Sequence, residues 1–367
     1  MRSLKLFIPL LLGAFSFFSP AQEGAAPRPA ALRVDDLGRE FQFVAFGDTR
    51  FTDPANTDVS ASDVRRDIVK GIASEKPAFV TIGGDLTYKG AVLQDWEVFD
   101  RETALWRDRG IPVFPALGNH ELMGKKKSKD DKSKNPQDEM EGLANYFARF
   151  PQLKQSRYCS MRAGSLLFLF MDSNPRGILK DEKGKEMDQG IWLQAQLDNL
   201  DPEIEFVLVV THHPPYSSSK MAEVDDPMAT NPETTKRKAK FGGHDVRPSD
   251  RALGEYLEHV QNRKGFHAAI VVLGSHVHNY ERQVHGGITF ITTGGGGAEP
   301  VYFPPQPTDL FKGTGKINYH YLLVRAQPGT LDFTMKRLDP EVEDAWTEAD
   351  HFTVTHGKAR LKAKSKR

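Results

Sequence analysis

The chain has 367 residues, of which 39% are hydrophobic and 27% are charged, with 49 basic residues against 49 acidic ones. This composition is typical of a soluble globular protein, and the length permits two or three domains. The single cysteine, Cys159, excludes an internal disulfide, and its strand-like surroundings favour a buried apolar residue over a catalytic thiol.

The N-terminus, residues 1–21, is predicted to be a signal peptide. A short basic start precedes an almost wholly apolar run from Leu6 to Phe18, and small residues offer a cleavage site before Gln22. The apolar run is shorter than the roughly 20 residues that a membrane-spanning helix needs, and no other stretch is long and apolar enough. We therefore expect an exported protein, periplasmic or secreted, with no membrane anchor after cleavage.

Strand-like and helix-like patterns follow one another along most of the chain. Residues 22–40, rich in Ala, Pro, Gly and charge, are predicted to be a linker. Strands are expected at residues 41–46, 78–82, 111–117, 165–171, 206–210, 269–273, 288–292, 319–324 and 331–335. Helices are expected at residues 62–74, 93–107, 141–150, 191–200 and 251–263. The alternation predicts an α/β domain over residues 41–340 with much parallel sheet, and the last strands, which have no helices between them, indicate a mixed or antiparallel part.

Three polar stretches interrupt or follow this pattern. Residues 125–139 and 217–243 are expected to be loops beside the functional motifs, either disordered or shaping the substrate site. Residues 341–367 are expected to be a C-terminal extension that ends in a basic tail. The tail is expected to be solvated and frayed, which is favoured over a contact with anionic surfaces. Without that tail and the basic residues of the signal peptide, 41 basic residues face 49 acidic ones, so no nucleic acid is expected as a specific partner.

Five short motifs, each at the end of an apolar run, carry side chains that bind metals. They are Gly47-Asp48-Thr49-Arg50, Gly84-Asp85-Leu86-Thr87-Tyr88, Gly118-Asn119-His120-Glu121, Thr211-His212-His213-Pro214-Pro215-Tyr216 and Gly274-Ser275-His276-Val277-His278-Asn279-Tyr280-Glu281-Arg282. In an open α/β sheet, ligands bind beyond the carboxyl ends of the strands, so these motifs are expected to converge. Carboxylates, an amide and imidazoles suit two metal ions, and two metals suit phosphoryl transfer. Glu281 and Arg282 are expected to pair and to buttress the histidines.

The five motifs resemble those of the calcineurin-like metallophosphoesterases, and within them the purple acid phosphatase branch, over roughly residues 41–337. The usual family start has a histidine two residues after the first aspartate, where this chain has Arg50. The purple acid phosphatase pattern instead has a tyrosine three residues after the second aspartate, where Tyr88 stands. The resemblance implies a four-layer sandwich, in which two packed, mainly parallel or mixed sheets are flanked by helices.

The resemblance also implies a ligand set for two metal ions. One ion would be held by Asp48, Asp85, Tyr88 and His278. The other would be held by Asp85, Asn119, His212 and His276, with Asp85 bridging. A phenolate with carboxylates suits Fe(III) at the Tyr88 site, and imidazole with an amide suits Fe(II), Zn or Mn at the other.

Four further residues are candidates for catalysis or substrate binding. His120 is expected to donate a proton to the phosphate or the leaving oxygen, and His244 lies where the family often places another such histidine. Arg50 could bind phosphate oxygens or pair with a nearby acid. His213 could bind substrate or compete with His212 as a ligand, although the family pattern of a histidine two residues before a proline favours His212.

The expected function is hydrolysis of phosphomonoesters by a metal-bound hydroxide in an exported enzyme. One alternative keeps the site and changes the substrate to a phosphodiester, such as a nucleotide or a phospholipid headgroup. Another is a secreted binding protein that keeps the fold without turnover, and loss of metal ligands would mark it. The oligomeric state is left open.

Overall fold

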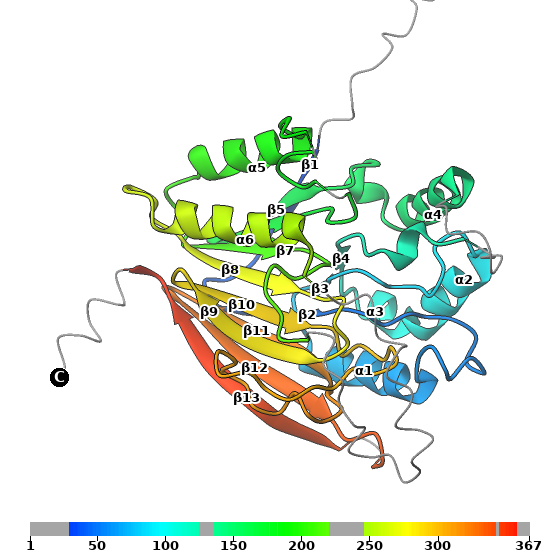
Figure 1. Cartoon of the computed structure of the whole chain (residues 1–367). Coiled ribbons are helices and arrows are strands. Elements are labelled where there is room, and N and C mark those ends of the chain that lie inside the picture. Colours follow the sequence, from blue (N-terminus) through cyan, green and yellow to red (C-terminus); the bar gives the residue numbers. More distant parts are fainter. Residues whose placement is uncertain are drawn as a thin grey trace, which may run out of the picture.

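The computed structural model describes residues 29–124, 135–175, 177–181, 183–219, 246–342 and 345–357. Within these residues two mixed β-sheets pack against each other and helices lie on their outer sides, which confirms the expected α/β class (Figure 1). The expected signal peptide, most of the basic tail and His244 lie outside the described residues.

The first sheet has seven described strands, in the order β1–β5–β6–β7–β8–β10–β9. The four adjacent strands β6, β7, β8 and β10 run parallel to one another. β5 runs antiparallel to its neighbour β6, and β9 runs antiparallel to its neighbour β10. The strands are β1 (Ala30–Val34), β5 (Cys159–Ala163), β6 (Leu166–Phe170), β7 (Phe206–Val210), β8 (Ala269–Gly274), β9 (Tyr280–His285) and β10 (Ile288–Thr293).

The second sheet has six described strands, in the order β13–β12–β11–β2–β3–β4. Its strands β2, β3 and β4 are parallel, whereas β11, β12 and β13 are antiparallel, as expected for strands without helices between them. The strands are β2 (Phe41–Phe46), β3 (Val80–Ile82), β4 (Val113–Pro115), β11 (Tyr319–Gln327), β12 (Thr330–Leu338) and β13 (Trp346–Thr355).

Helices cover the outer sides of both sheets. α5 and α6 lie over the first sheet, and α1 packs against β11 of the second (Figure 1). The helices are α1 (Ser62–Glu75), α2 (Leu93–Glu102), α3 (Ala104–Asp108), α4 (Pro136–Arg149), α5 (Asp188–Asp198) and α6 (Pro248–Gln261), with short 3-10 turns η1 (His120–Leu122) and η2 (Pro151–Leu153).

The central strands are apolar throughout because both of their faces are buried. In β7, Leu208 and Val210 belong to the core between the sheets, while Val207 and Val209 pack under α5 and α6. Phe168 of β6 joins the two sheets, because its ring contacts the Phe43 ring of β2 edge-on at 5.2 Å between centroids. Strands with helices on one face and a second sheet on the other lose the polar alternation of a half-exposed strand.

Two segments outside the expected domain are strands of the sheets. Residues 30–34, expected to be part of a linker, form β1 and pair in parallel with β5. Residues 346–355, expected to be part of a C-terminal extension, form β13 and pair with β12. Both are edge strands, and the pairing of each with its neighbour, β5 or β12, outweighs a weak local strand pattern.

The expected helix over residues 93–107 is divided at Thr103 into α2 and α3. The Thr103 hydroxyl donates a hydrogen bond to the Phe99 carbonyl at 2.6 Å, and such a bond bends helices.

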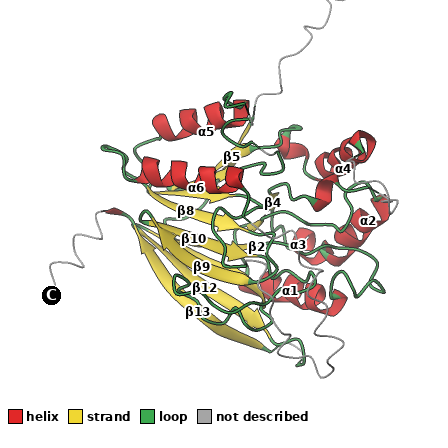
Figure 2. Cartoon of the chain, in the orientation of Figure 1, coloured by secondary structure: helices red, strands yellow, loops and turns green. Residues whose placement is uncertain are grey.

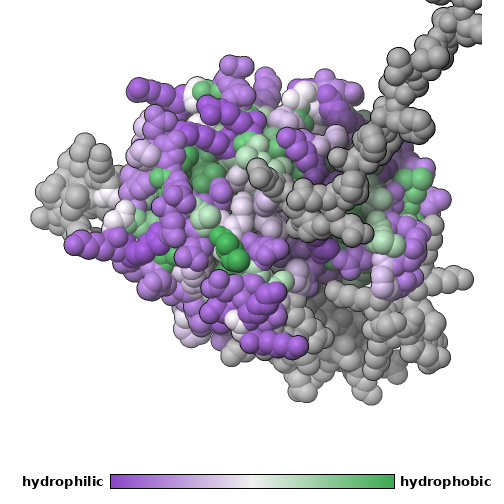
Figure 3. Space-filling view, turned by 90° about the horizontal axis from the view of Figure 1, so that it is seen from above, coloured by the Kyte–Doolittle hydropathy of each residue, from purple (hydrophilic) through white to green (hydrophobic). Residues whose placement is uncertain are grey.

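None of the described helices is long and apolar enough to cross a membrane. The face of the molecule seen from above is mainly hydrophilic, with hydrophobic residues in separate small patches (Figure 3).

The expected ion pair between Glu281 and Arg282 is wrong. These neighbours on β9 point to opposite faces of the strand, and Arg282 pairs with Asp350 of β13 at 2.7 Å between Nε and Oδ2. Glu281 is only 1% exposed and accepts hydrogen bonds from the Ser217 hydroxyl at 2.7 Å and the Ser218 amide at 2.6 Å. Burial is the main reason that the pKa of Glu281 is raised to about 7, and Asp309 raises it further.

This pKa predicts how Glu281 links stability to pH. The folded pKa lies above the ordinary value of 4.5, so the folded protein holds a proton that the unfolded chain releases. The contribution of this bound proton to the free energy of unfolding is therefore complete below about pH 4.5, and it is lost as the pH rises through about 7. We expect the melting temperature of the unmodified protein, relative to Glu281→Gln, to fall over this range and to be level on either side. A difference in melting temperature that does not change with pH would contradict the assignment.

Candidate metal centre

The five motifs follow five strands whose carboxyl ends meet. Asp48, Asp85 and Asn119 come after the parallel neighbours β2, β3 and β4, and His212 and His276 come after the parallel neighbours β7 and β8. The loops that follow these strands run together in the middle of the molecule (Figure 2). The two sheets therefore contribute to one site.

The turns at the strand ends approach one another so closely that a side chain is excluded at Gly84. A Cβ atom on Gly84 would lie 2.5 Å from the Gly118 amide nitrogen and 2.9 Å from the His212 Nδ1. Gly84 also has a φ of +96°, which glycine adopts readily. This glycine lets two loops of the second sheet touch each other and a histidine of the first.

Four residues of the site have a left-handed backbone although they carry side chains. Their φ values are 59° at Asp48, 47° at Arg50, 55° at Asp85 and 69° at His276. Such residues are strained, and strained residues cluster at functional sites. Backbone bonds hold them in place, among them Asp48 N–H to the Gly84 carbonyl at 3.1 Å and Arg50 N–H to the Asp85 carbonyl at 2.9 Å.

The Nε2 atom of His212 faces three potential ligand atoms. It lies 2.9 Å from the Asn119 Oδ1, 3.3 Å from the Asp85 Oδ1 and 3.1 Å from the His276 Nδ1. The His212 Nδ1 lies 3.0 Å from the Gly83 carbonyl oxygen, which can only accept, so the neutral ring carries its proton there. The Nε2 lone pair then faces two acceptor oxygens, and a cation between these atoms satisfies all of them.

A second group of ligand atoms surrounds the carboxylates. Asp48, Asp85 and His212 offer atoms that all lie within 4.8 Å of one another, and the His278 Nε2 lies 3.7 Å from the Asp48 Oδ1. The same Oδ1 is buried and has no hydrogen-bond partner among the described residues. A buried carboxylate oxygen without a donor fits a metal ion.

Hydrogen bonds to the backbone orient further imidazoles. The Nδ1 of His120 lies 2.6 Å from the Tyr88 carbonyl, and that of His278 lies 2.6 Å from the Glu299 carbonyl. Such bonds set the tautomer and direction of metal-binding histidines. His213 is oriented differently, because its Nδ1 lies 2.8 Å from the Ser173 hydroxyl.

The site holds more buried negative charge than its side chains neutralise. Burial and the charge of Asp85 raise the pKa of Asp48 well above its usual value and that of Glu121 to about 8. Burial lowers the pKa of His212, and burial and Arg50 lower that of His120 to about 4, so both rings favour the neutral form. Arg50 is the permanent cation against these acids, with Nη2 at 3.2 Å and Nε at 3.3 Å from the Asp85 Oδ2. The donor set and its charge therefore fit metal cations.

Glu121 has a structural role that the sequence motif did not reveal. One carboxylate oxygen accepts from the amides of Gly118 and Asp85 at 2.7 and 2.9 Å, and the other accepts from Leu86 and Thr87 at 2.7 and 3.3 Å. It therefore ties the loop after β3 to the loop after β4. Its place next to Asn119 and His120 is the signal that could have drawn attention to it.

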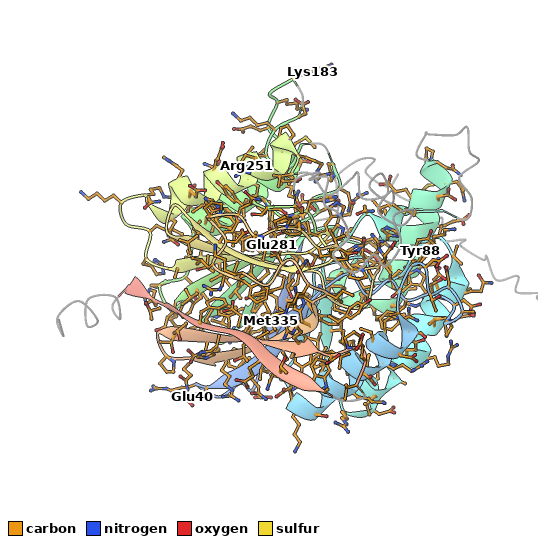
Figure 4. All side chains as sticks on the ribbon, turned by 60° about the horizontal axis from the view of Figure 1, so that its bottom comes forward. Glu40, Tyr88, Lys183, Arg251, Glu281 and Met335 are labelled. Atoms are coloured by element: carbon orange, nitrogen blue, oxygen red, sulfur yellow. The ribbon has the colours of Figure 1, made fainter. Side chains whose placement is uncertain are left out.

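The remaining candidates differ in how closely they approach the carboxylates. His213 lies in the imidazole group with His212 and His276, with its ring centroid 4.4 Å from that of His276. The Tyr88 ring lies beside the His120 ring at 5.5 Å and under the Lys89 ammonium, and within the described part of the chain its hydroxyl has no hydrogen bond to Asp48 or Asp85. Figure 4 shows Tyr88 on the side of the β3 and β4 loops, away from Glu281.

Comparisons with known proteins agree with this geometry. The fold is similar to that of a purple acid phosphatase from yellow lupin seeds, at 17% identity and a TM-score of 0.62, over 88% of this chain and 55% of the lupin protein. It is also similar to a dimetal phosphatase from Danio rerio, at 14% identity and a TM-score of 0.51, over 86% of this chain and 99% of the other. This chain thus spans little more than half of the lupin protein.

A search of curated proteins finds no match. The family model described as calcineurin-like phosphoesterase matches residues 41–280, which include all five strand-end motifs up to Tyr280. The chain therefore belongs to the calcineurin-like phosphoesterases, a family of hydrolases.

Proposed function

We propose that this protein is an exported phosphatase that hydrolyses phosphomonoesters at a centre of two metal ions. The observation that carries the proposal is the cluster of mutually facing acceptor atoms around the His212 Nε2 and the buried Asp48 carboxylate. Family membership supports a phosphate ester as the substrate. The apolar N-terminal sequence supports export.

The proposed ligands form two sets that share Asp85. Asp48, Asp85, Tyr88 and His278 would hold one ion, and Asp85, Asn119, His212 and His276 would hold the other. The positions of the two Asp85 oxygens support its role as a ligand of both ions. Oδ1 lies 3.3 Å from the His212 Nε2, and Oδ2 faces Arg50 and His120. The phenol of Tyr88 suits Fe(III), and the imidazole and amide set suits Fe(II), Zn or Mn.

When bound, the two ions acidify a water molecule and neutralise charge on the phosphate. The protein then has to bind the ester and to protonate the leaving oxygen. His120, whose Nε2 lies 3.7 Å from the Asp85 Oδ2, is the proposed proton donor, and it acts in its protonated form, which its pKa of about 4 confines to acidic pH. His244 is proposed as a second donor from its place in the sequence.

Arg50 and His213 are proposed to bind the phosphate group. The Arg50 Nε and Nη2 face Asp85, whereas its Nη1 has no hydrogen bond within the described part of the chain. The Nη1 atom can therefore donate to a phosphate oxygen, because the guanidinium of an arginine has several N–H groups that bind phosphate. The His213 ring lies among the other histidines, with its centroid 4.4 Å from that of His276 and its Nδ1 2.8 Å from the Ser173 hydroxyl.

Metal content and turnover should depend on the same ligands. We expect two metal ions per chain, loss of activity with a chelator, and recovery on adding Fe, Zn or Mn. Asn119→Ala and His212→Ala should each lower activity by more than the roughly 10–100-fold typical of residues that only support a ligand. Metal analysis and assays with 4-nitrophenyl phosphate and bis(4-nitrophenyl) phosphate give both readouts.

His259→Ala, which removes an exposed histidine on α6, is the matched control and should change neither readout. Full turnover by the metal-free protein would contradict the proposal. Faster turnover of the diester than of the monoester would assign the phosphodiesterase activity instead.

The proposed Fe(III) at Tyr88 predicts a colour. A phenolate bound to ferric iron absorbs visible light, so the iron-loaded protein should be purple. Tyr88→Phe removes only the hydroxyl, and it should remove the absorption band while the fold is kept. An unchanged visible spectrum in Tyr88→Phe would contradict this ligand.

The proposed role of His120 predicts a defect in turnover. His120→Ala should lower kcat by about 10²–10⁴-fold, the usual contribution of a proton donor, while both metal ions stay bound. Comparison of a substrate that has a good leaving group with one that has a poor leaving group checks the role, because the good leaving group needs less protonation. Equal losses with the two substrates would contradict it.

A further inference from the structure

The chain after His212 and His213 crosses from β7 to β9, the strand that follows His276 and His278. Residues 214–216 pass between β8 and α6, and glycines on both allow the approach. A Cβ atom on Gly274 would lie 2.8 Å from the Pro214 Cβ, and one on Gly254 would lie 2.7 Å from the Tyr216 Cε2. The segment is therefore confined on two sides before it reaches β9.

Tyr216 is held by a stack of three side chains. Its ring lies parallel to the His285 ring, at 3.8 Å between centroids and 11° between planes, and the Arg251 guanidinium lies 3.9 Å from its other face. Its hydroxyl donates to the Glu258 carboxylate. Arg251 and Glu258 both come from α6.

The next residues, Ser217 and Ser218, bind to the same face of β9. Glu281 accepts from the Ser217 hydroxyl and the Ser218 amide, as described above. The Gln283 amide donates to the Ser218 hydroxyl at 2.9 Å, and that hydroxyl donates to Asp309 at 2.6 Å. Glu281, Gln283 and His285 alternate along the strand and so share one face. We call these three side chains the β9 clamp.

Burial of the Glu281 carboxylate costs more free energy than a purely structural contact would require. It is 1% exposed, and its neighbour Arg282 pairs with Asp350 on the other face of the strand. Its hydrogen bonds come from a hydroxyl and an amide, and Asp309 adds a second buried carboxylate. A buried carboxylate that no opposite charge compensates lowers stability. Figure 4 shows Glu281 in the interior below Arg251 of α6.

The clamp joins the two loops that carry the histidines of the first sheet. Among the described residues, the backbone hydrogen bonds between them lie near the strand ends, from Thr211 N–H to the Leu273 carbonyl at 3.0 Å and from Ser275 N–H to the His212 carbonyl at 2.9 Å. Beyond that point, the chain after His213 is held by the contacts of residues 214–216 with β8 and α6 and by those of Ser217 and Ser218 with β9. Supporting contacts of this kind orient metal ligands.

We propose that Glu281 is a positioning residue, which through the β9 clamp holds the His212–His213 loop in register with the His276–His278 loop so that His212 and His276 meet at one metal ion. The inference rests on the proposed metal centre, and it adds a supporting residue outside the ligand set. Glu281 acts through the serines and does not touch the metal or the substrate.

Metal affinity tests this role. The metal-free protein and its variants are titrated with Zn²⁺ against a chromophoric chelator, and the affinity is expressed per folded molecule. Glu281→Ala should weaken Zn²⁺ binding about 10–100-fold, the usual effect of losing a residue that supports a ligand. Glu281→Gln should restore most of the affinity, because its amide can accept from Ser218 and donate to Ser217.

Glu255→Ala, which removes an exposed acid on α6, is the matched control and should leave the affinity unchanged. Glu281→Ala with the Zn²⁺ affinity of the unmodified protein would overturn the clamp. If Glu281→Ala does not fold, Ser217→Ala removes one donor and keeps the carboxylate, and unchanged affinity in that variant overturns the proposal equally. Absence of Zn²⁺ binding by the unmodified protein would instead refute the metal centre.

Discussion

Buried negative charge is the constraint on which the rest of this structure depends. Asp48, Asp85 and Glu121 are each fully buried, and Arg50 is the permanent cation placed against them. Carboxylates in such surroundings are stable only if cations or hydrogen-bond donors compensate them. The protein supplies amides to Glu121 and leaves acceptor atoms of Asp48, Asp85 and His212 facing one another. This imbalance fits the binding of metal cations by these groups.

The two sheets bring these buried polar groups close together in space, although the groups are far apart in the sequence. Each motif occupies the carboxyl end of a parallel strand, and the two sheets place five such ends around one point. The turns there are strained, with left-handed residues at Asp48, Asp85 and His276. The large core between the sheets, in which Phe168 meets Phe43, provides the stability that offsets this strain.

The site is supported by buried polar residues as well as by strands. Glu121 connects the loops after β3 and β4, and Glu281 connects the loop after β7 to β9. Both are glutamates that accept backbone amides, and both have raised pKa values because they are buried. One joins loops of the second sheet and the other joins loops of the first. The loops of each sheet are thus connected by a side chain that is not itself a proposed ligand.

The sequence by itself determined which chemical groups are present and that they follow strands, because apolar runs ending in Gly-Asp or His-x-His are local patterns. It predicted the α/β class, the bounds of β7 and the convergence of Asp48, Asp85, Asn119, His212 and His276. Only the tertiary structure decided that residues 30–34 and 346–355 complete the sheets, since an edge strand forms through pairing with a neighbouring strand, which is β5 for the first segment and β12 for the second. The tertiary structure also decided that Arg50 pairs with Asp85 and that Arg282 pairs with Asp350 and not with Glu281. It decided as well that Glu281 accepts hydrogen bonds from two serine residues. Charged side chains have several possible partners in the sequence, and packing between distant segments selects among them.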